Sequence, residues 1–204
     1  MERSFEAVLV EQCATTLAGV KPASLFRYQG ADKRQPREAA ARWAKELAPY
    51  GITIRVLKYC PQTGACLIYL YRAGWLRSIL SEPSTRAFLA GQGYGADQSC
   101  QELLRQLSRR LCLEREFPHE IGLFLGYPPC DVLGFLHDAG RHSKLSGYWQ
   151  VYGDAQAALA LFAKYKKCAD VYARCKGLRK WLTEFSALDE RPATDVKVWG
   201  EFMG

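Results

Sequence analysis

From Phe117 to Leu136 the chain reads Phe-Pro-His-Glu-Ile-Gly-Leu-Phe-Leu-Gly-Tyr-Pro-Pro-Cys-Asp-Val-Leu-Gly-Phe-Leu, and after a short basic loop it reads Gly-Tyr-Trp-Gln-Val-Tyr-Gly from Gly147 to Gly153. Pro118 suits the first turn of a helix, where a missing N–H costs nothing. The Gly-Tyr-Pro-Pro sequence at 126–129 stops that helix and opens a second one. We therefore expect a helical hairpin over 117–140, followed by a short strand at Trp149.

The N-terminal third alternates strand and helix signals. Strands are expected at 24–28, 52–59 and 66–71, with a helix at 36–48 between the first two. A strand–helix–strand unit favours a right-handed crossover, and a short turn favours a hairpin. The fold class is therefore α/β (α+β), with a small mixed sheet of three or four strands, the fourth at Trp149. Further helices are expected at 2–17, 74–80, 83–90 and 96–113.

A long C-terminal helix is expected to begin after Asp154, which is a good N-cap residue. We expect residues 1–184 to form a single globular domain and residues 185–204 to form a polar, mobile tail. The residues expected in the core are Ile54, Val56, Leu67, Ile68, Phe124, Leu125, Phe135, Phe162 and Tyr165.

Four motifs resemble an uncharacterised bacterial family that is known only as a domain of unknown function. They are Leu-Ala-Gly-Val-Lys-Pro-Ala-Ser-Leu at 17–25, Phe-Pro-His-Glu-Ile-Gly-Leu-Phe-Leu-Gly-Tyr-Pro at 117–128, Gly-Tyr-Trp-Gln-Val-Tyr-Gly-Asp at 147–154 and Lys-Tyr-Lys-Lys-Cys at 164–168. The resemblance extends from about Ala14 to Cys175. It implies membership of that family and brings no established activity.

Composition limits the classes of protein to consider. No apolar run approaches the ~20 residues that a membrane span needs, and the acidic residues near the N-terminus argue against a signal peptide. Eight cysteines without such a signal are typical of free thiols in a reducing compartment, so we expect a cytoplasmic protein.

Positive charge is concentrated near the C-terminal helix. The net charge is +7, and residues 141–181 contain nine Lys or Arg against two Asp. A basic helix of this kind attracts nucleic acid, although a solvated helix face is the commoner reason for it. Residues 118–139 also have the spacing of a helix-turn-helix, with a close contact at Gly122 and a core residue at Val132. The second helix lacks side chains that read base edges, so DNA recognition is disfavoured.

The cysteines and histidines do not form a regular metal-binding pattern. No Cys-x-x-Cys occurs, and His119, Cys130, His137 and His142 lack the spacing of a zinc site, so no metal is expected. Cys130, near the start of a helix, could act as a nucleophile with His119 or His137 as base, which would make the chain a hydrolase or transferase. Whether the chain is an enzyme therefore stays open, and no cofactor is indicated.

The leading hypothesis is a ligand-binding or regulatory domain with an unknown small ligand, an anion being one candidate. The first turn of the hairpin offers free amides that favour an anion, which places His119 and Glu120 at the site. Lys21 and Arg72 adjoin expected strand ends, where α/β sheets often open a crevice. The candidate ligand-binding residues are His119, Glu120, Tyr127, Tyr148, Lys21 and Arg72.

Overall fold

The computed structural model of the chain describes residues 3–174, with side chains as far as Val171. Among these residues the fold is a mixture of helices with two small sheets, which confirms the expected α/β class. They divide into two compact units, one formed by 3–74 and 167–174 and the other by 75–166. The single-domain assignment for 1–184 stays a prediction, and the tail expected at 185–204 lies outside the described residues.

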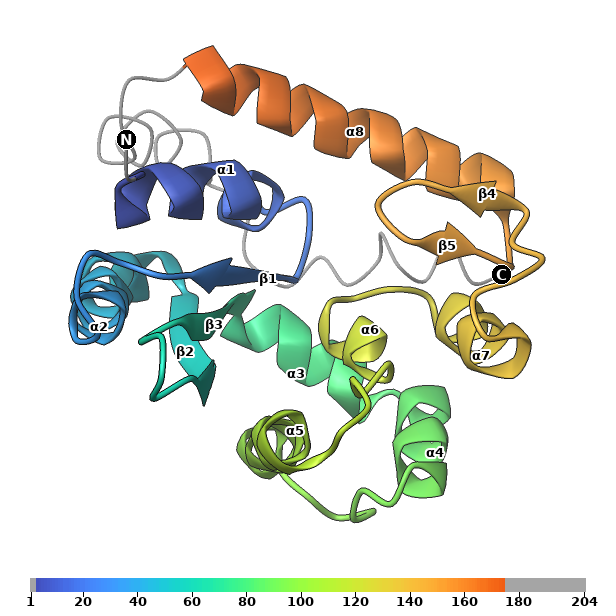
Figure 1. Ribbon diagram of the computed structural model, residues 1–204. Coiled ribbons are helices and arrows are strands. Elements are labelled where there is room, and N and C mark those ends of the chain that lie inside the picture. The colour runs from blue at the N-terminus through green and yellow to red at the C-terminus, as the bar shows by residue number, and fades with distance from the viewer. Residues whose placement is uncertain (1–2, 175–204) are drawn as a thin grey trace. The chain divides into compact units, whose positions relative to one another are not determined.

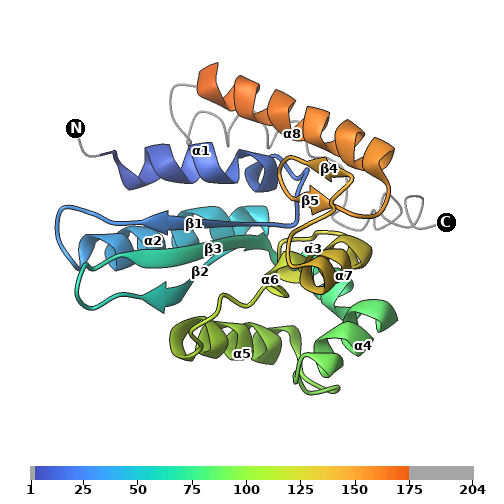
Figure 2. The same ribbon diagram turned by 45° about the vertical axis from the view of Figure 1, so that its right-hand side comes forward.

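The first unit is built around a three-stranded sheet. Its elements are α1 (Phe5–Leu17), β1 (Ala23–Tyr28), α2 (Gln35–Leu47), the 3-10 turn η1 (Ala48–Tyr50), β2 (Ile52–Tyr59) and β3 (Cys66–Arg72). The strand order is β1-β3-β2, and β3 pairs antiparallel with both neighbours (Figures 1 and 2). β1 and β2 therefore run parallel to each other, as a crossover through α2 requires, but they are not adjacent.

This pairing corrects the expectation of a mixed sheet. The crossover leaves room for one strand between β1 and β2, and the hairpin between β2 and β3 places β3 there. Both ladders of this sheet are therefore antiparallel. The strand expected at Trp149 is not a fourth member. It contributes β5 (Gln150–Val151), which pairs only with β4 (Leu145–Ser146) in a separate two-stranded sheet.

One face of the large sheet carries the core of the first unit. Alternate residues of the strands point to this face, as the two-residue period of a strand dictates, and both helices pack on it. Core residues from the strands are Phe26, Tyr28, Ile52, Ile54, Cys66, Ile68 and Leu70, and those from the helices include Phe5, Leu9, Cys13, Trp43 and Leu47. The period-2 pattern that predicts these strands is thus the pattern that forms the core.

The second unit is mostly helical. It contains nearly all of α3 (Ala73–Ser81), followed by α4 (Pro83–Gly91), α5 (Cys100–Leu113), α6 (Ile121–Phe124), α7 (Pro129–Asp138), the β4–β5 pair, and α8 (Ala155–Arg174) as far as Lys166. The Asp154 side chain accepts hydrogen bonds from the amides of Gln156 and Ala157, at 2.9 and 3.0 Å. This capping confirms the expected start of the long C-terminal helix. None of the helices formed by residues 3–174 has the length and apolar character that crossing a bilayer requires.

The expected helical hairpin is present as α6 and α7. A Cβ on Gly122 would lie 2.8 Å from a methyl group of Val132, which confirms the close contact expected between the two helices. The first helix is shorter than expected. Pro118 and His119 form a tight turn, with hydrogen bonds from Ile121 N to Pro118 O and from Gly122 N to His119 O, so the α-helix begins only at Ile121.

Five of the nine expected core residues are buried, and four are partly exposed. The buried ones are Ile54, Ile68, Phe124, Leu125 and Tyr165. The partly exposed ones are Val56, Leu67, Phe135 and Phe162. Phe124 has no exposed surface, and its ring lies 6.0 Å from that of Tyr94.

Replacing Phe124 by Ala should lower the free energy of unfolding by about 3–5 kcal/mol, because the side chain is fully enclosed and its loss leaves a cavity. The matched control is Phe117→Ala, since Phe117 is 48% exposed and should cost under about 1 kcal/mol. Urea titration of both variants measures the difference. Equal costs for the two phenylalanines would contradict the assignment of Phe124 to the core.

Candidate functional site

A polar pocket of about 720 Å³ lies along one side of α5. The helix is strongly amphipathic, with Leu103, Leu104, Leu107 and Leu111 buried on one face. Residues of the helix that line the pocket recur at helical spacing beside this apolar face. They are Glu102, Arg105, Gln106, Arg109 and Arg110, with Glu114 just after the helix; the opposite wall is the loop residues Gln92, Gly93 and Gln98. We call this cavity the α5 pocket.

Side chains of α5 hold the loop wall of the pocket in place. Arg110 Nη1 donates to the carbonyl oxygen of Gln92 at 2.9 Å, and Gln106 Nε2 donates to that of Gly93 at 2.8 Å. Gln98 Nε2 in turn donates to Gln106 Oε1 at 3.0 Å. Gly93 has a φ of +83°, which glycine adopts without strain. The loop is therefore fixed by bonds from outside its own backbone.

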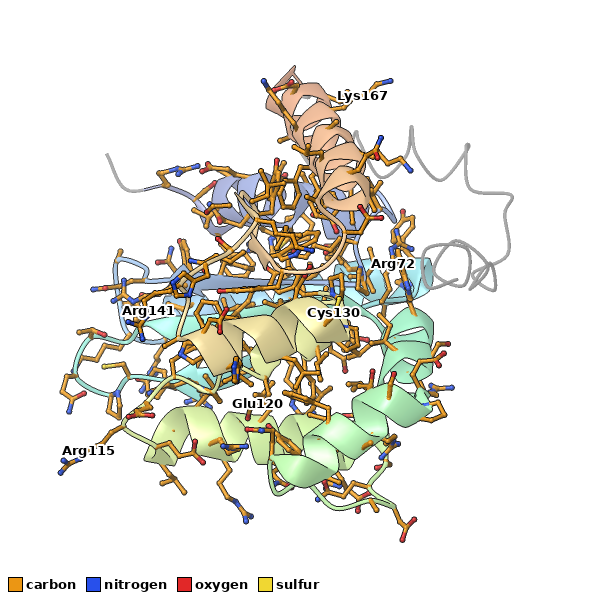
Figure 3. The ribbon with its side chains drawn as sticks, turned by 90° about the vertical axis from the view of Figure 1, so that its right-hand side faces the viewer. Arg72, Arg115, Glu120, Cys130, Arg141 and Lys167 are labelled. Atoms are coloured by element: carbon orange, nitrogen blue, oxygen red, sulfur yellow. The ribbon has the colours of Figure 1, made fainter. Side chains whose placement is uncertain are left out.

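Arg110 is the most constrained charged residue of the pocket. Its guanidinium contacts Glu114 Oε1 through Nε at 2.8 Å and Glu120 Oε1 through Nη1 at 2.8 Å. Glu120 is only 2% exposed, and the Tyr94 hydroxyl donates to the same oxygen at 2.9 Å. Burial, together with the adjacent Glu120 carboxylate, raises the pKa of the Tyr94 phenol, so Tyr94 stays a neutral donor. Figure 3 shows Glu120 beside α5 and Arg115 extending away from it.

Two other arginines of the pocket are less constrained. Arg105 and Arg109 are exposed, and the nearest carboxylate to Arg105 is Glu102 at 3.9 Å, a weak surface pair. Glu102 is committed elsewhere, because its Oε2 accepts from the amide of Ser99 at 2.8 Å and completes a capping box at the start of α5. The middle of the pocket wall therefore presents two available guanidinium groups beside the oriented Arg110.

Glu120 does not occupy the position that the sequence suggests. The expectation of an exposed first turn is wrong for it, because its side chain is buried and makes no capping hydrogen bond. The ion pair with Arg110 draws the carboxylate inward. His119 is exposed, and its ring lies 4.8 Å from that of Phe135 and 6.0 Å from that of Phe117. Adjacent residues of one turn thus point to different environments.

Tyr127 and Tyr148 belong to an aromatic cluster rather than to the α5 pocket. The Tyr127 hydroxyl donates to the carbonyl oxygen of Tyr148 at 3.5 Å, and its ring stacks on Trp149 at 5.0 Å. Burial raises the pKa of Tyr127 to about 12. Tyr148 packs edge-on against Tyr165 at 5.1 Å and remains 46% exposed. These contacts give both tyrosines a packing role.

Lys21 and Arg72 belong to the first unit, whereas the other four candidates belong to the second. Arg72 donates to the carbonyl oxygens of Thr16 and Leu17 at 2.9 Å each, so it caps the C-terminus of α1. Burial lowers the pKa of the Lys21 ammonium to about 8. The assignment of these two residues, and of His119, Tyr127 and Tyr148, as ligand contacts stays a prediction.

Asp131 joins α7 to the sequence motif at 147–154. It is 3% exposed, and its Oδ2 accepts from Trp149 Nε1 at 2.7 Å. Its Oδ1 accepts from the amides of Tyr152 and Gly153, at 2.8 and 2.7 Å. The carboxylate thus ties the first turn of α7 to the segment that leads into α8. Every one of these donors is an N–H group, which suits an ionised acceptor.

The proposed nucleophile and base are not paired. The contacts of the His119 ring are Phe117 and Phe135, while Cys130 Sγ lies 3.9 Å from Asp131 Oδ1. Desolvation and the adjacent Asp131 carboxylate raise the pKa of the Cys130 thiol, so the thiolate is disfavoured. Within residues 3–174 no three His, Cys, Asp or Glu side chains gather into a group that could hold a metal ion.

Sequence reasoning missed the α5 pocket. The signal that could have found it is the run Arg105, Arg109 and Arg110 at helical spacing, next to the glycine-rich segment Gly91–Gly95. That segment lacks the features of a phosphate loop, yet it forms the wall that faces these arginines. The contacts between this loop and α5 are tertiary contacts, which local sequence patterns do not predict.

Replacing Glu120 by Gln should destabilise the protein by about 3 kcal/mol, because it removes the charge of a buried ion pair and leaves Arg110 partly uncompensated. Glu116→Gln is the control, since Glu116 is exposed and should change stability by under about 0.5 kcal/mol. Chemical unfolding of both variants measures this. A cost below about 1 kcal/mol for Glu120→Gln would show that the pair contributes little.

Replacing Asp131 by Asn should cost about 2 kcal/mol, because the new amide group presents N–H donors to Trp149 Nε1 or to the two backbone amides. Thermal melting followed by circular dichroism reports the change in stability. Asp97→Asn, at an exposed position, is the matched control. An unchanged melting temperature would mean that the Asp131 hydrogen bonds are replaced at no cost.

Comparison with known proteins confirms the resemblance to a family of unknown function. No match to this chain was found among curated proteins or among solved structures. One family model matches residues 9–180, which include the α5 pocket, Glu120 and Asp131. The chain therefore belongs to the family described as "Protein of unknown function (DUF3793)".

Proposed function

We propose that the second unit, residues 75–166, is a ligand-binding module that holds a small anionic molecule in the α5 pocket. The observation that carries this function is the support of Arg110 by a buried carboxylate. Glu120 orients the guanidinium and the Tyr94 hydroxyl orients Glu120. Binding groups that are fixed by such supporting hydrogen bonds lose little entropy when a ligand arrives.

The chemistry of the pocket fits an anion. Guanidinium groups bind carboxylates and phosphates through two parallel N–H bonds, and Arg105, Arg109 and Arg110 line one wall. The carboxylates of Glu102 and Glu114 are already engaged by Ser99 and Arg110. Glu120 keeps a role at this site, as the residue that positions Arg110 rather than as a ligand contact.

The catalytic alternative has weaker support. A hydrolase or transferase that uses Cys130 with His119 needs a thiol within reach of its base, and the two rings nearest His119 are both phenylalanines. The raised pKa of Cys130 also opposes nucleophilic attack. A ligand-binding or regulatory role therefore fits the described residues better. A cytoplasmic location agrees with Cys13, Cys60 and Cys66 being free thiols.

Calorimetric titration with inorganic phosphate and with citrate, at low ionic strength, tests the proposed function. At least one of these anions should bind, and Arg105→Ala and Arg109→Ala should each weaken binding about tenfold, because each removes one charge-assisted contact. Added salt should weaken binding further, since two of the three charges are exposed.

The matched control is Arg115→Ala. Arg115 is exposed, follows α5 directly and does not line the pocket, and it extends away from the helix in Figure 3. It should leave anion affinity within about twofold of the parent. Failure of both anions to bind, or equal losses in Arg115→Ala and Arg109→Ala, would rule out a specific anion site on α5.

A further inference from the structure

The α5 pocket differs from a typical small-molecule site in its lining. Most ligand pockets are walled mainly by apolar and aromatic side chains, with a few polar groups that fix orientation. The nine residues that line this pocket include no apolar or aromatic side chain. Eight are Arg, Gln or Glu, and the ninth is Gly93. A ligand that fills it must therefore satisfy polar groups over most of its surface, or those groups stay in water.

The charges follow a fixed order along the pocket wall. Glu102 lies at one end, Arg105, Arg109 and Arg110 lie in the middle, and Glu114 lies at the other end. At 1.5 Å per residue the three arginines span ~7.5 Å of the helix axis, while the two glutamates are ~18 Å apart. The positive region is thus short and is bounded by a carboxylate at each end.

This order discriminates between kinds of anion. An extended polyanion would have to pass one of the carboxylates, and like charges repel. A compact dianion fits between them. The carboxylates accept hydrogen bonds but cannot donate, so the parts of a ligand that reach Glu102 or Glu114 must carry donors. Hydroxyl groups supply such donors without adding charge.

The amide groups of the pocket add a complementary requirement, for acceptors on the ligand. Gln98 and Gln106 each use one N–H of the side-chain amide within the protein, for Gln106 Oε1 and Gly93 O respectively. Each amide nitrogen carries a second hydrogen, and both residues line the pocket. The lining therefore offers donors as well as acceptors, which suits a ligand that both donates and accepts.

We infer that the ligand of the α5 pocket is a small molecule with a dianionic head group on a hydroxylated, non-aromatic body, such as a sugar phosphate or a hydroxylated dicarboxylate. This inference rests on the proposed anion-binding function and narrows it. The arginines hold the head group. The hydroxyl groups meet the two glutamines and the carboxylate oxygens that Ser99 and Arg110 do not engage, Glu102 Oε1 and Glu114 Oε2. A nucleotide is disfavoured, because the lining includes no aromatic side chain on which a base could stack.

Titration calorimetry with glucose 6-phosphate, inorganic phosphate, tartrate, succinate and adenosine monophosphate tests the ligand class. Glucose 6-phosphate should bind at least about tenfold more tightly than inorganic phosphate, since two added hydroxyl contacts of ordinary strength give this factor. If the head group is a dicarboxylate, tartrate should exceed succinate by a similar factor. The nucleotide should bind no more tightly than inorganic phosphate.

Two charge-neutralising variants sharpen the result. Glu114→Gln should raise the affinity for inorganic phosphate by about two- to fivefold, because a repelling charge is lost, and should reduce the advantage of glucose 6-phosphate over phosphate. Glu102→Gln should act in the same two directions. Glu116→Gln, exposed and outside the pocket, should change neither quantity. Thermal melting confirms that each variant is folded before it is titrated.

The possible outcomes separate the two proposals. If inorganic phosphate binds through the arginines but neither hydroxylated compound gains affinity over its simpler counterpart, the ligand class is wrong and the anion site stands. Tighter binding of the nucleotide than of glucose 6-phosphate would also overturn the class. If none of the five compounds binds, both the site and the class are wrong. A gain in affinity for phosphate together with a smaller advantage of glucose 6-phosphate over phosphate in Glu114→Gln would support both.

Discussion

The buried contact between Glu120 and Arg110 is the constraint on which the second unit depends. A carboxylate that is removed from water is costly unless its charge and its lone pairs are satisfied. Here one oxygen of Glu120 accepts from both Arg110 and Tyr94. These three residues come from α5, from the loop before it and from the turn before α6. The pair thus sets the relative placement of three segments, and the pocket is a product of that placement.

A second buried acid has a comparable part in the same stretch of sequence. Asp131 gathers Trp149, Tyr152 and Gly153 onto the first turn of α7. Glycine makes this approach feasible, because a Cβ on Gly153 would lie 2.7 Å from Cys130 Sγ. The two acids therefore anchor the motif at 117–128 and the motif at 147–154 to different neighbours. Both acids therefore have a structural role in the described residues.

Local sequence patterns were sufficient for most of the secondary structure. The strand at 52–59 alternates apolar and polar residues, and the helix after Asp154 has a strong cap, so both were found at their observed starts. The strand order was not predictable in the same way. The place of β3 between β1 and β2 depends on long-range contacts between the strands, which local patterns do not specify. Likewise, Tyr148 and Trp149 have strand propensity but lie in the turn of a two-residue ladder.

In the candidate site, too, local patterns identify residues but do not predict their distant contacts. The sequence pattern identifies Glu120 as a candidate, but its place at a helix start predicts an exposed side chain. The local pattern does not predict the ion pair with Arg110, which belongs to another helix. Arg72 adjoins an expected strand end, and in the structure it donates to carbonyl groups of α1. Ionisable side chains are long and find partners far along the chain. Their roles therefore follow from tertiary structure more than from neighbours in sequence.

The strand order of the first unit has a consequence for synthesis on the ribosome. The central strand of the sheet is the last of the three to be made, so β1 and β2 have no partner until Cys66–Arg72 has left the exit tunnel. The first ladder joins Ala23 to Tyr71 and must close a long loop. At ordinary rates of elongation, β1 waits roughly a few seconds as an unpaired, largely apolar segment. During that interval α1, already complete, is the nearest cover for it, and chaperones that bind apolar nascent segments would compete for the same surface.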